Sequence, residues 1–313
     1  MVVLAKLRKV STRFALSLTA ALIPGLASGG SDLASLHLGL AQFALDTHDP
    51  AAALRYTRNA TTEAERLVRA KALLVTGSHQ EAERLLKELI EGQYYRGQAA
   101  LLLAELPTDS GDNKTREYLE TAAKRASGSD RQKALYRLAE IEREAGHTDR
   151  AGKVLASMEP GYWAALGYMN IAADYGRQDR NPSRALVALR VALAMSEEDV
   201  HSQRSQELRS RLLVRAGYLA YDHGDYEKAI GFLEKIPLES YSTSHGLYLH
   251  GLALSASGNQ RAAMQSWHRA KKYPLAYPGV ANAWLGTGRG YDLAGYLGPV
   301  SYTHLTLPTN REV

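Results

Sequence analysis

The chain has 313 residues, with 38 Lys and Arg against 33 Asp and Glu, a net charge of +5 and a sequence pI near 9.2. Hydrophobic residues make up 45% and charged residues 23%, as in ordinary globular proteins, which excludes collagen-like and wholly disordered chains. There is no Cys, so disulfides, Cys-ligated zinc, iron–sulfur clusters and thiol nucleophiles are excluded. The basic pI by itself suggests nucleic acid or an anionic membrane as a partner.

The first 30 residues have the pattern of a secretory signal peptide. Their basic residues are Lys6, Arg8, Lys9 and Arg13, and they include no acidic residue. The apolar run 14–23 and the helix breaker Pro24 follow, and the run is too short to span a membrane, which takes about 20 residues. With no Cys for a lipoprotein anchor, we expect cleavage between Ala27 and Ser31 and export, to a bacterial periplasm. The alternative is an uncleaved N-terminal anchor, which would then be the chain's membrane contact.

The basic pI belongs to this leader. Its four positive charges account for most of the net +5, and +1 remains for the rest of the chain. The charge therefore indicates an export signal, and we expect no nucleic-acid partner.

Residues 32–299 are predicted to be helical throughout. Good helix formers dominate this region, and apolar residues recur at spacings of three and four, as in Leu67, Ala70 and Leu74. Short polar turns with a glycine separate the helical runs, at Gly77, Gly146, Gly224 and Gly258. The pattern predicts a chain of helical hairpins.

An alanine follows each turn and sets a period. These alanines are Ala53, Ala82, Ala151, Ala185, Ala229 and Ala263, and two of the intervals are 34 residues. The interval of 69 between Ala82 and Ala151 predicts a degenerate unit near residue 117. The interval of 44 between Ala185 and Ala229 predicts an insertion, which the polar stretch 196–205 accommodates.

On these residues the chain resembles the tetratricopeptide repeat family, whose unit is a 34-residue helix–turn–helix. Beside the alanines, the residues that carry the resemblance are Trp163, Leu166, Gly167, Gly224, Gly251, Trp267 and Pro274. Glycine or alanine at facing positions lets two helices approach closely, and a large residue one turn later fills the groove between units. The first unit departs from the pattern, because Thr57 stands where an apolar residue is expected.

The resemblance implies an all-α, right-handed solenoid of antiparallel helix pairs, with about 6–8 units over residues 32–299. A helix near 277–286 looks like the opening of a further repeat, so we expect the array to be truncated within its last unit. Residues 300–313 lack helical periodicity and resemble the translation of a transposase-type sequencing adaptor, which predicts a non-native tail. The alternative is an ordinary C-terminal tail.

Catalytic signatures are weak or missing, and we expect neither an enzyme nor a cofactor or metal. The sequence contains no paired-histidine zinc motif, no nucleophile elbow and no phosphate loop. The basic segment Arg204–Arg215 contains Glu207 and no interleaved aromatic residue, which favours an exposed helix face or a salt-bridged contact between repeats over a nucleic-acid site.

The family resemblance places ligand contacts on the inward face of each first helix. Carried over by phase, these positions are Tyr136, Glu140, Arg143, Tyr168, Arg211, Tyr218, Tyr221, His245 and Tyr248. Tyrosine outnumbers phenylalanine 18 to 3, and a tyrosine can bury its ring while its hydroxyl stays wet. The alternative is that these tyrosines pack between repeats. The Lys/Asn carboxylate clamp of some co-chaperone members is not matched.

The sequence therefore predicts a non-catalytic scaffold of the bacterial cell envelope that binds a protein or peptide in its concave groove. Two alternatives stay open. The chain could be the substrate-recruiting part of a larger envelope enzyme or polysaccharide-export assembly. It could also be a glycan-binding module, since tyrosine faces stack on sugars.

Overall fold

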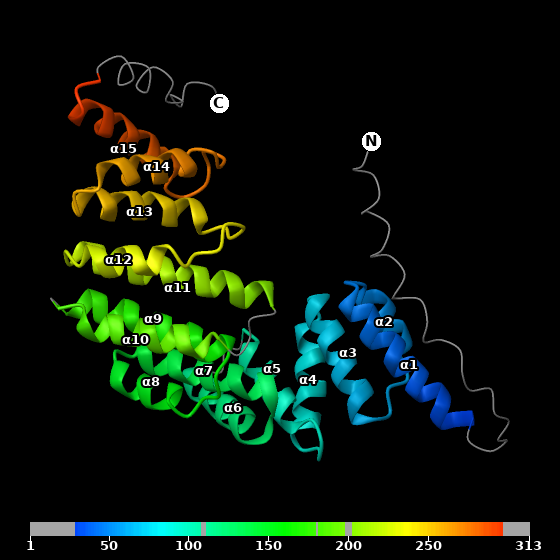
Figure 1. The fold of residues 1–313 in the computed structure, drawn as a ribbon. Helices are drawn as coiled ribbons and strands as arrows, with labels where there is room; N and C mark the ends of the chain where they lie inside the picture. Colours follow the sequence, from blue (N-terminus) through cyan, green and yellow to red (C-terminus); the bar gives the residue numbers. More distant parts are fainter. Residues whose placement is uncertain (1–28, 108–110, 180, 198–201, 297–313) are drawn as a thin grey trace, which may run out of the picture. The chain divides into compact units, whose positions relative to one another are not determined.

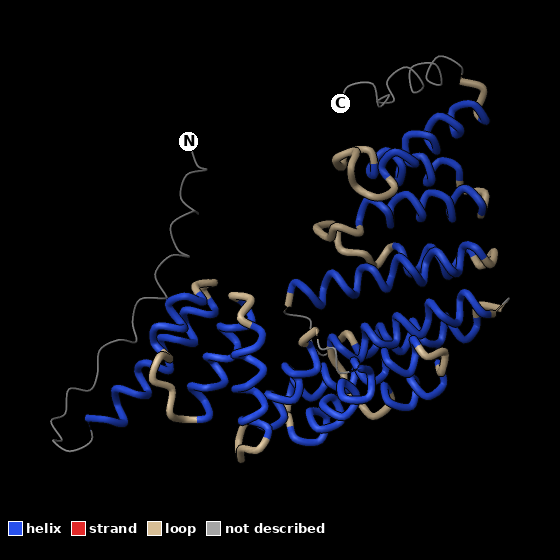
Figure 2. The backbone as a smooth tube through the Cα atoms, turned by 180° about the vertical axis from the view of Figure 1, so that it is seen from behind, coloured by secondary structure: helices blue, strands red, loops and turns tan. Residues whose placement is uncertain are grey.

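The computed structural model describes residues 29–107, 111–179, 181–197 and 202–296. These residues form fifteen helices and no strand, which confirms the predicted all-α array (Figure 2). The predicted leader, except for Gly29 and Gly30, and the predicted tail 300–313 lie outside the described residues. Within the described part, no helix is long and apolar enough to cross a membrane.

The chain divides into two compact units, Met1–Leu85 and Leu86–Val313. The first unit contains α1 (Gly29–Asp46), α2 (Pro50–Tyr56), α3 (Glu63–Val75) and the beginning of α4 (His79–Ile90). Its small core packs alanines of α1 and α2 against α3, with Ala41, Ala44, Ala53, Val68 and Ala72 all buried. Arg69 of α3 pairs with Glu81 of α4, with 2.9 Å between nitrogen and oxygen.

In its described residues, the second unit contains the rest of α4, five further helix pairs and the first helix of a sixth. The first helices are α5 (Arg96–Glu105), α7 (Gly128–Glu144), α9 (Tyr162–Gln178), α11 (Gln203–Asp222), α13 (Thr243–Ala256) and α15 (Val280–Leu293). The second helices are α6 (Gly111–Arg125), α8 (Thr148–Leu155), α10 (Ser183–Met195), α12 (Tyr226–Leu233) and α14 (Gln260–Ala270). The predicted degenerate unit near residue 117 is the pair α5 and α6, in which Leu119 and Ala122 are buried.

The first helices of this unit form one continuous layer (Figure 1). Each of α5, α7, α9, α11 and α13 contacts the next first helix along the chain. Every second helix packs against the first helix of its own pair and against the first helix of the following pair. The exposed side of the first-helix layer is therefore a continuous face that runs across successive repeats.

The turn within most pairs has the same backbone geometry. Gly77, Gly146, Gly224 and Gly258 have φ between 78° and 90°, a left-handed conformation that costs glycine little. The next residue then donates its N–H to the carbonyl five residues back, as Asp225 does to Ala220 at 2.9 Å. This is the Schellman ending, and it satisfies carbonyls that the finished helix leaves without partners. In the first unit His48 takes the glycine's place, with φ of 63°.

The same turns place the periodic alanines in the core. Ala53, Ala82, Ala151, Ala229 and Ala263 each stand four residues after the residue that follows the left-handed position, and all are buried. Ala185 is also buried, at the start of α10.

Glycines in the first helices permit the close approach that the sequence predicts. A Cβ on Gly217 would lie 2.5 Å from Cγ of Leu233, and one on Gly251 would lie 2.2 Å from Nε1 of Trp267. Each large residue comes from the second helix of the same pair. Its side chain packs directly against the backbone of a glycine in the first helix. Thr57, the apparent exception of the first unit, is buried because its hydroxyl donates to the carbonyl of Ala53 at 2.8 Å.

Candidate partner-binding face

Helix α11 shows which side of the first-helix layer is open. Its exposed residues include Arg211, Arg215, Tyr218 and Asp222, which recur every three or four positions and therefore lie on one face. Tyr218 is the most prominent aromatic side chain of this stripe, with 52% of its surface exposed. The remaining sides of α11 carry the buried residues that pack against its neighbours. The predicted groove residues Arg211 and Tyr218 thus lie on the open face.

Side chains one repeat apart join adjacent first helices. The amide of Asn170 in α9 donates to the Tyr136 hydroxyl in α7 at 3.3 Å, and these residues are 34 positions apart. The Ser244 hydroxyl of α13 donates at 2.9 Å to the backbone carbonyl of Pro278, which lies in the loop before α15 and is again 34 positions away. The sequence period is therefore also a period of contacts. Because of its burial and the nearby Glu140, the pKa of Tyr136 is raised.

A charged network links α7 to α9 on this layer. Arg143 donates two hydrogen bonds to Glu140, at 2.9 and 3.1 Å, and a third to Asp174 at 3.3 Å. Asp174 also pairs with Arg177, one turn further along α9. The bonds to Glu140 raise the pKa of Arg143, which therefore stays charged. Two predicted groove residues, Glu140 and Arg143, are thus largely engaged with each other and with a buried aspartate.

Arginines recur along the layer at the repeat period. Arg143, Arg177 and Arg211 are 34 residues apart on α7, α9 and α11, and His245 of α13 follows after another 34. Arg211 lies 3.7 Å from Glu207, too long for a hydrogen bond. Desolvation lowers the pKa of Arg215, and repulsion from Arg211 and Arg177 lowers it further. The open face therefore concentrates positive charge between α9 and α11.

A cleft of 520 Å³ lies beside this charge, between α11, α13 and α15, and its lining is mixed, with Ser255, Asn282 and Arg289 among the apolar residues. The predicted groove residues Tyr221 and Tyr248 line it together with Leu252, Leu285 and Leu293. Leu285 and Leu293 are 53% and 68% exposed, so each leaves aliphatic surface in contact with water. Burial is the main cause of the raised pKa of Tyr248, so its ring is already partly withdrawn from water. The cleft offers apolar surface that a partner would cover.

Two predicted groove residues have different surroundings. Tyr168 is nine residues from Arg177 on α9, which places it on the opposite side of that helix, and it packs against the core. His245 lies at the repeat position of the arginines, but it is half-buried, and desolvation lowers its pKa. Neither belongs to the exposed surface around Arg211.

Sequence reasoning missed Asp174, Arg177, Arg215, Leu285 and Leu293. Arg177 could have been predicted from the sequence, because it lies 34 residues after Arg143 and 34 residues before Arg211. The arginines of the basic segment Arg204–Arg215 make different contacts in the structure. Arg204 stacks on the Tyr162 ring at 3.7 Å, and Arg209 donates to Glu197 at 3.3 Å.

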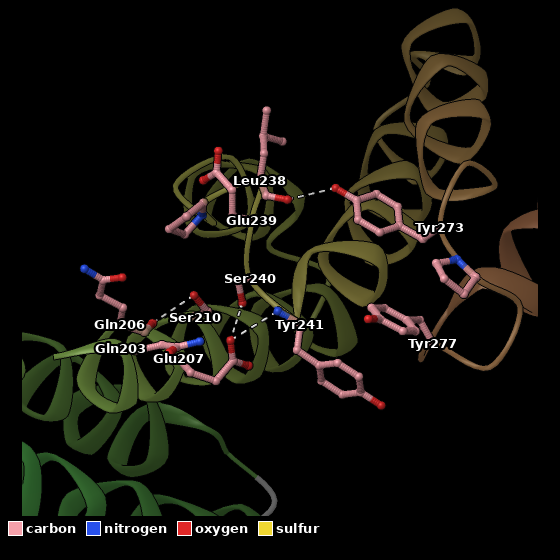
Figure 3. A pocket seen from close by; sticks show the side chains of 12 residues that line it. Gln203, Gln206, Glu207, Ser210, Leu238, Glu239, Ser240, Tyr241, Tyr273 and Tyr277 are labelled. Carbon is pink, nitrogen blue, oxygen red and sulfur yellow. Dashed lines mark hydrogen bonds between the residues drawn. The ribbon is translucent and has the colours of Figure 1, made fainter. Parts of the chain in front are cut away.

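A second and larger cleft, of 660 Å³, opens at the loops that precede α13 and α15 (Figure 3). Three tyrosines lie along it, and the ring centroids of Tyr241 and Tyr277 are 4.8 Å apart. The Tyr273 hydroxyl donates to the carbonyl of Leu238 at 2.9 Å. On the other side Glu207 accepts hydrogen bonds from the Ser240 hydroxyl at 2.7 Å and from the backbone of Tyr241 at 3.2 Å. Aromatic faces and polar groups therefore meet in one cleft.

Histidines and carboxylates do not converge on a metal site in the described residues. No group of three or more His, Asp or Glu could hold an ion there. His250 is instead joined to Ser266, with 2.7 Å between Nδ1 and Oγ, and burial lowers its pKa.

No family model matches the chain, and no curated protein sequence matches it significantly. Solved structures with a similar arrangement include a tetratricopeptide repeat protein from Parabacteroides merdae, at 15% identity and a TM-score of 0.45, covering 87% of this chain and 99% of that one. BtubC from P. vanneervenii is 18% identical, with a TM-score of 0.36 and coverages of 79% and 91%. A Rap protein complexed with Competence and Sporulation Factor is 12% identical, with a TM-score of 0.37 and coverages of 88% and 97%. All three scores are below 0.5, so the fold assignment rests on the helices, turns and period described above.

Proposed function

We propose that this chain is a non-catalytic scaffold that binds a protein or peptide through the open face of its first helices. The observation that carries the proposal is the cleft lined by Tyr221, Tyr248 and Leu285. It opens on the same layer as the exposed arginines of α11, Arg211 and Arg215. Protein interfaces combine aromatic and apolar anchors with arginine, and these residue types dominate measured binding energies. An extended face of repeats presents such residues to one long partner segment.

The exposed leucines of α15 offer apolar surface that a bound segment can cover. Leu285 and Leu293 are 53% and 68% exposed, so covering the rest of each side chain contributes about 1–2 kcal/mol, a fraction of the value for a fully exposed leucine. Tyr218, on the same layer, adds an exposed ring with a hydroxyl that can stay in water.

We propose further that the protein is exported and works in the bacterial cell envelope. The support is the basic, acid-free leader with its short apolar run and small residues up to Gly30. N-terminal sequencing of the protein from its native cells tests this: a first residue between Ser28 and Ser31 is expected, and a chain that still begins at Met1 contradicts cleavage.

A photo-crosslinking experiment tests the binding face. A photoreactive amino acid replaces Tyr218 on α11 or Val187 on α10, which are exposed to similar degrees, 52% and 58%. Irradiation of cells that express the full chain is expected to join a specific partner to position 218 and not to position 187. Equal crosslinking at both positions, or crosslinking at 187 alone, contradicts the assignment of the first-helix face.

Glycan binding is the second candidate function, and the tyrosine-lined cleft of Figure 3 favours it. The half-exposed ring of Tyr241 can stack on a sugar, while Gln203 and Gln206 line the same cleft with groups that can hydrogen-bond to hydroxyls. Titration with cell-wall polysaccharide fragments separates the two functions. Glycan binding is removed from consideration if Tyr241→Ala binds these fragments as wild type does.

A further inference from the structure

The positive charge between α9 and α11 comes from three arginines on one surface. Helices α9 and α11 are in direct contact, and Arg177 and Arg211 occupy the same position in successive repeats. Arg215 follows Arg211 by one helical turn and lies on the same exposed side of α11. All three belong to the open face of the first-helix layer.

Nearby carboxylates neutralise this charge only in part. Asp174 is shared between Arg143 and Arg177, so it cannot fully balance either. Glu207 lies 3.7 Å from Arg211, but its oxygens accept hydrogen bonds from the hydroxyls of Ser240 and Ser242 at 2.7 and 2.8 Å.

Arg215 has no such partner. In the described part of the chain, no carboxylate forms an ion pair or hydrogen bond with it. Asp222 lies on the same stripe but seven residues further on, about 10 Å along the helix. Desolvation lowers the pKa of Arg215, and repulsion from the neighbouring Arg211 and Arg177 lowers it further. A guanidinium in this setting gains most from an added carboxylate, because it would pair with an anion without giving up an existing partner.

The residues that line the neighbouring cleft favour an acidic peptide over a polysaccharide or a nucleic acid. A polysaccharide or a nucleic acid would satisfy arginines, but neither has aliphatic side chains to cover Leu252, Leu285 and Leu293. A peptide can carry acidic and apolar residues in one segment. The cleft and Arg215 lie on neighbouring parts of one layer, since Tyr221 of α11 lines the cleft and is less than two turns from Arg215.

We therefore propose that the partner segment is an acidic peptide with an apolar anchor. Its carboxylates pair with Arg177, Arg211 and Arg215, and its apolar side chain enters the cleft between α13 and α15. This inference rests on the proposed function, and it adds the chemistry of the partner and the residues that recognise it.

The test uses the full chain and a short fluorescein-labelled peptide of glutamates around a leucine pair, with affinities measured by fluorescence anisotropy. The matched peptide has glutamine for every glutamate, and an alginate oligosaccharide of similar charge serves as the polysaccharide arm. We expect the glutamate peptide to bind about tenfold more tightly than the glutamine peptide at low salt, and this preference to shrink as salt is added. Alginate that binds as tightly as the glutamate peptide would overturn the inference.

Single substitutions test which residues cause the preference for the glutamate peptide. Arg215→Gln is expected to weaken the glutamate peptide by about tenfold. The control Arg190→Gln removes the same charge from an exposed position on α10 and should leave the affinity unchanged. Leu285→Ala should weaken both peptides, because it removes part of the cleft and no charge. Far-UV circular dichroism of each variant checks that the helices remain.

Two results would overturn the inference. One is equal loss in Arg215→Gln and Arg190→Gln, which would make the effect one of net charge alone. The other is equal binding of the two peptides with dependence on Leu285, which would leave the proposed peptide-binding function standing and remove its acidic specificity. The proposed binding function is tested separately by photo-crosslinking at position 218, which does not depend on the acidity of the partner.

Discussion

Replacing Gly251 by alanine tests whether bare backbone in a first helix is needed for the packing of a pair. The added Cβ would lie 2.2 Å from Nε1 and 2.6 Å from Cδ1 of Trp267, whereas ordinary contacts begin near 3.4 Å. Trp267 is 3% exposed, and its indole donates to the carbonyl of Tyr248 at 3.1 Å. On its other side the indole faces Gly286 of α15, where a Cβ would lie 2.9 Å away. The ring therefore cannot move aside without disturbing a second contact.

Three effects set the expected size of the change. Overpacking a buried contact costs about 1–3 kcal/mol, and a lost indole hydrogen bond costs about 1 kcal/mol more. Alanine in place of glycine within a helix stabilises the helix by about 1 kcal/mol, which offsets part of this loss. The free energy of unfolding of Gly251→Ala should therefore fall by about 1–3 kcal/mol.

Urea unfolding followed by far-UV circular dichroism and by tryptophan emission measures this change. The control is Gly176→Ala in α9, where a Cβ would meet nothing within 4 Å. There only helix propensity acts, so the free energy of unfolding should rise by up to about 1 kcal/mol. If Gly251→Ala unfolds at the same urea concentration as wild type or a higher one, the close-approach argument is wrong.

Two further predictions concern the first unit. His48→Gly should raise the free energy of unfolding by up to about 1 kcal/mol, because His48 holds φ at 63° where the other turns have glycine; a lower urea midpoint would contradict this. Glu65 accepts hydrogen bonds from the backbones of Thr62 and Thr61 in a capping box, and these bonds hold its pKa below the ordinary value. Its stabilisation is therefore present above the unfolded-state pKa and is lost as the pH falls through the folded-state pKa. Thermal melts at several pH values should show wild type losing more stability than Glu65→Gln between about pH 5 and 3, with a difference of about 1 kcal/mol at pH 7.

The arrangement of helices could be predicted because local interactions determine it. At four of the turns, a glycine after the first helix, a capping residue and an alanine four positions later specify the turn and its buried contact within a few residues. Repetition of these signals at 34 residues then predicted the pairs, including the weak pair α5 and α6. The close approach at Gly251 followed from the same pattern, since a missing side chain is visible in the sequence.

The open face could be predicted only in part. The exposure of Arg211 and Tyr218 could be predicted, because helical phase determines which side of a helix faces solvent. Tyr168 was placed in the same groove although it lies on the opposite side of α9, because the length and register of each helix shift its phase. Arg177 could have been found by extending the arginine period.

What the sequence alone determined is the class of structure: helices, turns, their period and the small residues between them, all of which depend on neighbours within one repeat. Only the tertiary structure decided the division at Leu85, the burial of Asp174 between two arginines and the isolation of Arg215 among like charges. It also decided that Tyr221, Leu285 and Leu293 share one cleft. These features join residues that are roughly one or two repeats apart, and their charge balance and exposure depend on how successive pairs stack. No local pattern contains that information, because each contact depends on the combined geometry of several helices.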